Sequence, residues 1–170
     1  QGVIDVVTQV ELFSPKLRGN KLLELIVEEL PDNPPDEFEV IVDYKGMSRP
    51  DPSGKSGGSA LWAIYGWQVQ TYAHLRSLLT TKPIIAGVLI YLNELAPTKS
   101  DFLELQKALR KGDPEEILPE AGSTDETVLH CWKPPAKGDE PPLLSIEFRL
   151  SRAVRVVPVT SKSISESLDA

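Results

Sequence analysis

The stretch that decides the fold is Phe38-Glu39-Val40-Ile41-Val42-Asp43-Tyr44-Lys45-Gly46. Its apolar and β-branched residues predict a strand over 38–45. Asp43 and Lys45 are two residues apart, so on a strand their side chains point to the same face. Because Asp43 follows an apolar run, we expect it near the buried end of this strand. The pattern therefore predicts a carboxylate that can bind a metal ion, with a cation beside it.

Two further motifs lie on either side of this strand in the sequence. Upstream, Gly2-Val3-Ile4-Asp5 begins another apolar strand and ends in a second carboxylate. Downstream, Gln68 and Tyr72 are four residues apart in a predicted helix, so they share one helix face. Each motif alone is common, and their order along the chain is the informative feature.

In this order the three motifs resemble the PD-(D/E)XK nuclease superfamily, and within it the RecB-like branch. The pattern is G-x-x-D ending at Asp5, then D-Y-K at residues 43–45, then Q-x-x-x-Y from Gln68 to Tyr72. The resemblance covers residues 2–92, about half of the chain. It implies an α/β protein with a restriction-endonuclease-like core, in which helices flank a mixed central sheet.

Carboxylates on adjacent strands suit the chemistry of phosphodiester hydrolysis. Hard oxygen ligands hold Mg²⁺ or Mn²⁺ and leave positions open for water and phosphate oxygen. We expect Asp5 and Asp43 to be the metal ligands, with the backbone carbonyl of Tyr44 as a third. Lys45 would orient the attacking water or stabilise the developing charge.

The resemblance adds roles that spacing does not supply. It implies that Gln68 and Tyr72 flank the metal site and help to place the lysine and the DNA. The expected catalytic set is therefore Asp5, Asp43, Lys45, Gln68 and Tyr72. The expected function is that of a Mg²⁺- or Mn²⁺-dependent deoxyribonuclease in DNA repair, recombination or defence.

Each motif also has a purely structural interpretation. Asp43 and Lys45 would then form a surface ion pair of little energetic value, and Asp5 would be a polar residue on an edge strand. Gln68 and Tyr72 would be the polar rim of a core helix. Glu11 shares strand parity with Asp5 and is a candidate accessory ligand.

Two alternative functions follow from these interpretations. One is a catalytically inactive nuclease fold that serves as a DNA-binding or protein-interaction scaffold. The other is a metal-independent α/β interaction domain whose motif match is accidental, and it predicts that Asp5 and Lys45 lie far apart.

Composition describes an ordinary globular protein. The chain has 170 residues, of which 41% are hydrophobic and 25% charged, which predicts a single domain over 1–170. The resemblance implies that this domain is nuclease-like. No apolar run reaches membrane-spanning length, and no signal peptide is recognisable. The chain lacks an initiator Met, so we expect a fragment of a longer protein. The upstream histidine of RecB-like nucleases is absent from it.

The single cysteine, Cys131, excludes an internal disulfide and fits a reducing cytoplasm. It also excludes a four-cysteine iron–sulfur cluster, which some RecB-like relatives carry, from this segment.

The net charge of −7 is unusual for a DNA-binding protein, because affinity for DNA comes mostly from Lys and Arg. Acidic residues cluster in 24–36 and 112–126, away from the motifs. Basic residues near the motifs predict a local basic face: Lys45, Arg49, Lys55, Arg76 and Lys82. We expect weak affinity for DNA, and a helicase or other partner that delivers the substrate. Cleavage mode, polarity and strand preference do not follow from the sequence.

Hydrophobic periodicity and turn residues predict the remaining elements. Asn20 is the expected cap of a helix over 21–30, and residues 46–58 are expected to be a loop beside the site. Trp62 and Trp67 in the helix 59–80 are candidates for core packing or for base stacking. The other predicted helices are 99–111 and the tail 163–170, and the other predicted strands are 2–12, 84–92, 128–132, 143–150 and 153–159.

Overall fold

The computed structural model describes residues 5–30, 32–51, 58–133 and 140–160, without the side chain of Ser59. The chain divides into two compact units. The first, here the sheet unit, comprises residues 1–45, 50–90 and 154–170, and the second, the helical unit, comprises 46–49 and 91–153. The single domain over 1–170 stays a prediction.

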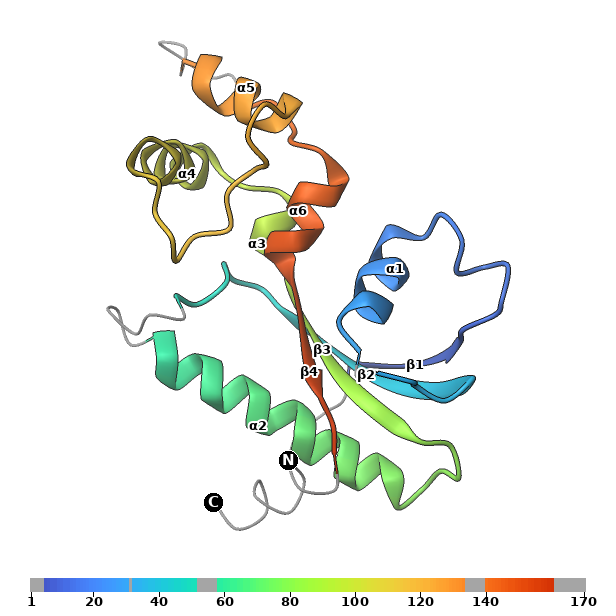
Figure 1. The fold of residues 1–170 in the computed structure, drawn as a ribbon. Coiled ribbons are helices and arrows are strands. Elements are labelled where there is room, and N and C mark those ends of the chain that lie inside the picture. The colour runs from blue at the N-terminus through green and yellow to red at the C-terminus, as the bar shows by residue number, and fades with distance from the viewer. Residues whose placement is uncertain (1–4, 31, 52–57, 134–139, 161–170) are drawn as a thin grey trace. The chain divides into compact units, whose positions relative to one another are not determined.

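The sheet unit is built on a four-stranded sheet with the order β1-β2-β3-β4. The strands are β1 (Val6–Glu11), β2 (Glu37–Lys45), β3 (Ile84–Tyr91) and β4 (Val154–Pro158). β1 pairs antiparallel with β2, and β3 pairs antiparallel with β4. β2 and β3 run in the same direction (Figure 1), so the sheet is mixed. The expected α/β class is confirmed.

Helices lie on the two faces of this sheet (Figure 1). α1 (Lys21–Glu28) lies on one face, and α2 (Gly58–Ser77) crosses the other on its way from β2 to β3. The side chain of Asn20 accepts a hydrogen bond from the backbone N–H of Leu23 and so caps α1 as predicted.

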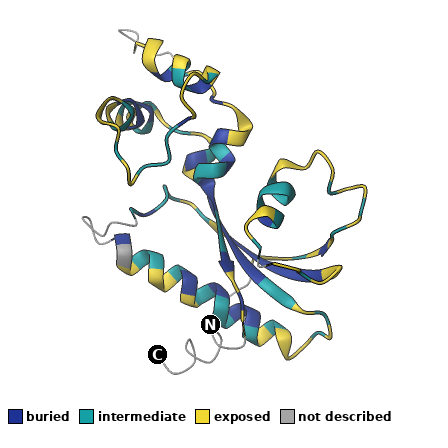
Figure 2. Ribbon diagram, in the orientation of Figure 1, coloured by how far each residue is buried: buried dark blue, intermediate teal, exposed yellow. Residues whose placement is uncertain are grey.

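The central strand β2 is buried on both sides (Figure 2). Phe38 and Val40 are fully buried, and Phe38 lies directly opposite buried Val10 of β1. The alternate residues of β2 face α2, where Ile41 packs with Tyr72 and Ala73. Asp43 and Lys45 have the same parity as Ile41, so they face α2 as well.

α2 lies close against the sheet at Gly87 of β3. A Cβ atom added to Gly87 would lie 2.6 Å from both Cβ and Cγ2 of Val69, which is itself fully buried. Only glycine fits here, because no side chain can occupy the space that Val69 fills. This contact fixes how closely α2 lies against the sheet.

An ion pair connects the C-terminal half of α2 to the beginning of β2. The guanidinium of Arg76 donates two hydrogen bonds to the Glu39 carboxylate, at 2.9 and 3.0 Å. The bond from Arg76 is the largest cause of the lowered pKa of Glu39, and desolvation of the buried carboxylate opposes it.

The helical unit contains α3 (Leu92–Leu95), α4 (Lys99–Lys111), α5 (Thr124–Cys131) and α6 (Ile146–Ala153). Its core consists of apolar side chains from α4, α5, α6 and the segment before α6: Phe102, Leu105, Leu129, Leu144 and Phe148. Below this core Arg152 binds Glu94 and Glu116, and Glu116 also accepts from Arg49.

Two strand predictions in this unit are wrong. Residues 128–132 fall mostly in α5, because Ser123 caps a helix by accepting from the N–H of Glu126. Residues 143–150 lead into α6, where Ser145 accepts from the N–H of Phe148. Apolar residues alternate with polar ones over 144–150, which is typical of a strand. However, Leu144 and Phe148 are four residues apart and pack together in the helical core.

The other described elements agree with the predicted ones to within a few residues at their ends. α3 was not predicted, and α4 begins with a complete capping box between Thr98 and Asp101. The tail 163–170 and residues 52–57 of the predicted loop 46–58 lie outside the described residues. Among the described helices, none is long and apolar enough to cross a membrane.

Replacing Gly87 with alanine tests the contact between α2 and β3. The added methyl group would overlap Val69, so we expect Gly87→Ala to lower the free energy of unfolding by about 1–3 kcal/mol. Denaturant unfolding measures the change. Gly46→Ala is the control, because an added Cβ there meets nothing within 4 Å. Equal stability of the two variants would contradict the close packing.

Replacing Glu39 with glutamine tests the ion pair with Arg76. The lowered pKa means that Glu39 stabilises the fold at pH values above its ordinary value of 4.5, and that this contribution is lost as the pH falls through the lower folded-state pKa. We therefore expect Glu39→Gln to lower the melting temperature at pH 7, and the difference from wild type to shrink below pH 4. The control is Glu37→Gln, which removes an exposed carboxylate from the same strand. A difference between Glu39→Gln and wild type that persists at low pH would contradict the assignment.

Candidate active site

The register between β1 and β2 brings the two predicted metal ligands together. Val6 pairs with Val42, and one step further along this antiparallel ladder Asp5 comes opposite Asp43. Directly opposite residues have side chains on the same face. The Asp5 Oδ2 atom also accepts a hydrogen bond from the backbone N–H of Tyr44, at 2.9 Å. Gly2 to Ile4 of the same motif lie outside the described residues.

The two carboxylates differ in their surroundings. Asp5 is exposed, whereas Asp43 is only 5% exposed. Burial raises the pKa of Asp43, the hydrogen bond and charge of Lys45 oppose that rise, and the neighbouring Asp5 carboxylate adds to it. Negative charge at this point is therefore unfavourable, and a cation bound between the two carboxylates would relieve the cost.

Lys45 lies at the centre of a polar chain. Its Nζ donates to Asp43 Oδ2 and to Gln68 Oε1, both at 2.8 Å. The Gln68 amide in turn donates to the hydroxyl of Tyr72 at 2.8 Å. The lysine is thus held between β2 and α2, beside the carboxylate pair and largely shielded from solvent.

A further residue of α2, which the sequence analysis did not single out, also contacts Lys45. Lys45 Nζ lies 4.3 Å from the centroid of the Tyr65 ring, a cation–π contact. Tyr65 precedes Gln68 by three residues and Tyr72 by seven, so all three lie on one face of α2. That helical spacing was the available signal for Tyr65.

All five predicted catalytic residues meet at this point of the sheet unit. The accidental-match alternative expected Asp5 and Lys45 to lie far apart, whereas Asp5 is bonded to Tyr44 and Lys45 to Asp43. Tyr44 itself is 45% exposed, and its side chain has the opposite parity on β2. Tyr44 can therefore contribute only its backbone carbonyl to a metal ion.

This donor set fits a hard divalent cation. Two carboxylates and a backbone carbonyl are oxygen ligands of the kind that Mg²⁺ takes, and Mg²⁺ keeps several waters of its own. Among the residues with described positions, no group of three or more Asp, Glu, His or Cys side chains is arranged to hold a metal ion. The protein would therefore supply a minority of the ligands.

Glu11 does not belong to the site. It pairs with Glu37 at the other end of β1, six residues from Asp5 and thus about 20 Å away. The predicted basic face is also altered, because Arg49, Arg76 and Lys82 each bind a carboxylate. Lys55 lies outside the described residues.

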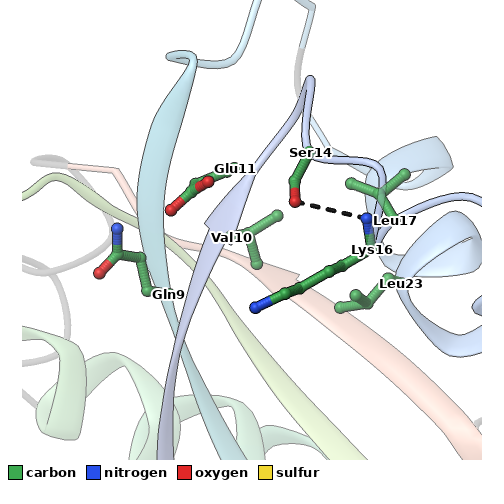
Figure 3. A pocket seen from close by; sticks show the side chains of 7 residues that line it. All are labelled: Gln9, Val10, Glu11, Ser14, Lys16, Leu17 and Leu23. Carbon is green, nitrogen blue, oxygen red and sulfur yellow. Dashed lines mark hydrogen bonds between the residues drawn. The ribbon is translucent and has the colours of Figure 1, made fainter.

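A pocket of about 250 Å³ lies elsewhere, between β1 and the segment that leads into α1 (Figure 3). The side chain of Lys16 extends across it toward β1. The residues that line it are Gln9, Val10, Glu11, Ser14, Lys16, Leu17 and Leu23. None of the five predicted catalytic residues is among them, so this pocket is separate from the site.

Comparisons with known proteins add no relative: no family model, curated protein or solved structure matches the chain. The residues and their geometry therefore carry the functional conclusion.

Thermal unfolding tests the metal site without any assay of activity. A ligand that binds only the folded state stabilises it, by about 2.7 kcal/mol at one hundred times the dissociation constant. We expect Mg²⁺ or Mn²⁺ to raise the melting temperature of the wild type and not of Asp43→Asn. The control is Glu37→Gln, which should respond as wild type does. Equal shifts in all three proteins would contradict a site at Asp43.

Proposed function

We propose that the chain is a metal-dependent deoxyribonuclease with a restriction-endonuclease-like core of the RecB-like type. The observation that carries this proposal is the placement of Asp5 opposite Asp43 with the Lys45 amino group 2.8 Å from Asp43. Two carboxylates and a lysine at the same end of adjacent strands can supply the metal ligands and the cation that suit phosphodiester hydrolysis.

In the reaction the oxygen of a water molecule bonds to phosphorus, and the bond from phosphorus to the leaving sugar oxygen breaks. One proton leaves the water, and the leaving oxygen gains a proton. A bound Mg²⁺ or Mn²⁺ would supply Lewis-acid activation of the phosphoryl group and of the water. The remaining tasks are to position the water and to stabilise negative charge, and they belong to side chains of the protein.

Lys45 is suited to both of these tasks. Its ammonium group can donate to the water or to a phosphate oxygen, and its position is fixed by Asp43, Gln68 and the ring of Tyr65. A donor that is held in place before the reaction costs no reorganisation when charge develops. Burial strengthens its electrostatic effect, because little water screens it.

Gln68 and Tyr72 act as positioning residues in this proposal. Gln68 accepts from Lys45 and donates to Tyr72, so the amide can hold only one orientation. Tyr72 is buried in the cluster that joins α2 to β2, which anchors the chain of hydrogen bonds to the core. Loss of either residue would let Lys45 move without removing its charge.

The resemblance to RecB-like nucleases supports the proposed substrate and role, and the single cysteine, Cys131, supports the proposed compartment. We propose DNA as the substrate, a role in repair, recombination or defence, and a cytoplasmic location. A helicase or another nucleic-acid-processing protein would deliver the strand, because the net charge is −7 and three of the basic residues that the sequence placed near the motifs are in ion pairs: Arg49, Arg76 and Lys82.

The test is cleavage of linear single- and double-stranded DNA with Mg²⁺ or Mn²⁺. We expect Asp43→Asn and Lys45→Ala each to lower the rate by about 10²–10³-fold, the usual cost of removing one electrostatic contributor. Tyr72→Phe should cost less, since it removes only the hydroxyl at the end of the chain.

The chain offers a matched pair of controls. Glu37 and Lys82 form an exposed ion pair at the other end of β2, so Glu37→Gln and Lys82→Ala remove the same kinds of charge away from the site. Both should cleave at the wild-type rate. If the wild type binds metal and DNA but cleaves neither the single-stranded nor the double-stranded substrate, the protein is an inactive scaffold of the same fold.

A further inference from the structure

Two cations from the sheet lie on neighbouring aromatic rings of α2. Lys45 of β2 covers Tyr65, and Arg155 of β4 covers Trp62 with its Cζ atom 3.9 Å from the ring centroid. Trp62 and Tyr65 are three residues apart, so their Cβ atoms are about 5–6 Å from each other. The same end of α2 thus organises a lysine and an arginine.

Two contacts hold Arg155 against α2. Its Nη1 donates to the backbone carbonyl of Trp62 at 2.7 Å, while the guanidinium plane stacks on the indole. Gly66 lies beside this guanidinium, and a Cβ added there would come within 3.3 Å of Nη2. The absence of a side chain at Gly66 therefore leaves the space that the guanidinium occupies.

The two cations share one face of the sheet. Arg155 pairs with Leu89, two residues beyond Gly87 on β3, and Gly87 faces α2. Lys45 also faces α2 and lies two strands away from Arg155. The strands β2 and β4 are two strand spacings apart, which is about 10 Å. Arg155 is partly exposed, so an anion can approach it.

We propose that Arg155 is a second phosphate-binding cation of the site, which holds a phosphate of the same DNA strand close to the scissile one. The inference rests on the proposed nuclease function and names how its substrate is gripped. A planar guanidinium suits a phosphate, which it can bind with two parallel hydrogen bonds. Trp62, half-buried below it, keeps the plane in one orientation.

A phosphate contact at Arg155 would help a protein with a net charge of −7 to bind DNA, which is also negatively charged. Three basic residues that the sequence placed near the motifs each form an ion pair with a carboxylate: Arg49, Arg76 and Lys82. Arg155 was not among them, because it is more than one hundred residues away from Lys45 in the sequence. Only the pairing of β4 with β3 brings it to this face.

The test is the salt dependence of DNA binding, which a purely structural arginine would not alter. Binding is measured with a single-stranded oligonucleotide in the Asp43→Asn background, without divalent metal, so that the strand stays intact. Removing one phosphate contact lowers the slope of log K against log[salt] by about 0.7. We expect Arg155→Gln to show that change and to bind about tenfold more weakly at low salt.

Two further variants complete the experiment. Lys21→Gln removes one positive charge from α1, where Lys21 binds Glu24, and should leave the slope unchanged. Arg155→Lys keeps the charge but loses the planar fork, so the slope should stay while affinity falls. The Arg155→Lys variant also provides a test if Arg155→Gln does not fold. If Arg155→Lys had the wild-type salt slope and the wild-type affinity for DNA, that result would count against the inference.

An unchanged salt slope in folded Arg155→Gln would overturn the proposal. Arg155 would then have only a structural role, in which it connects β4 to α2. If the wild type still cleaved DNA with metal, the proposed function would survive that result. A wild type that showed neither binding nor cleavage would remove the proposed function together with this inference.

Discussion

The site depends first on the backbone register between β1 and β2. Val6 lies opposite Val42, and this pairing carries Asp5 to a position opposite Asp43. Because side chains alternate along a strand, a slip of one residue would send Asp5 to the face that α1 covers. The apolar pair of Val10 and Phe38, both buried, resists such a slip since it would expose Val10 on the wrong face. A hydrophobic contact at one end of the β1–β2 pair thus sets the position of Asp5 relative to Asp43 at the other end.

The helix that completes the site is held by a contact of a different kind. Gly87 lets α2 approach β3 so closely that Val69 fills the space of a missing side chain. The residues of α2 on either side of Val69 that share its face also contact the sheet. Toward the helix N-terminus this face presents Tyr65 and Gln68 to Lys45, and toward the C-terminus it presents Arg76 to Glu39. The polar contacts are therefore consequences of where a glycine and a valine meet.

Much of the sheet unit could be predicted from the sequence, because its elements have strong local signals. Asp43 and Lys45 needed only the two-residue period of a strand, and Gln68 and Tyr72 only the spacing of a helix. The meeting of Asp5 with Asp43 needed the family resemblance as well, since nothing local specifies a register. Tyr65 was missed because helix 59–80 carries several aromatic residues, and spacing alone does not tell which ring a lysine covers. Trp67 is 46% exposed, so of the two placements considered for it the structure does not support core packing. In the helical unit the perfect alternation of residues 144–150 outweighed the single cap at Ser145.

The order of segments along the chain gives the helical unit the character of an insertion. Residues 91–153 leave the sheet at the end of β3 and return at the start of β4, and Ile90 and Val154 are direct partners in the ladder. Antiparallel partners have Cα atoms about 5 Å apart, the distance that a tight hairpin turn spans. The sheet therefore needs nothing longer than a turn at this point, and its strand order would be the same with one. Sequence between β3 and β4 can accordingly vary in length and content during evolution while the carboxylates and the lysine keep their positions.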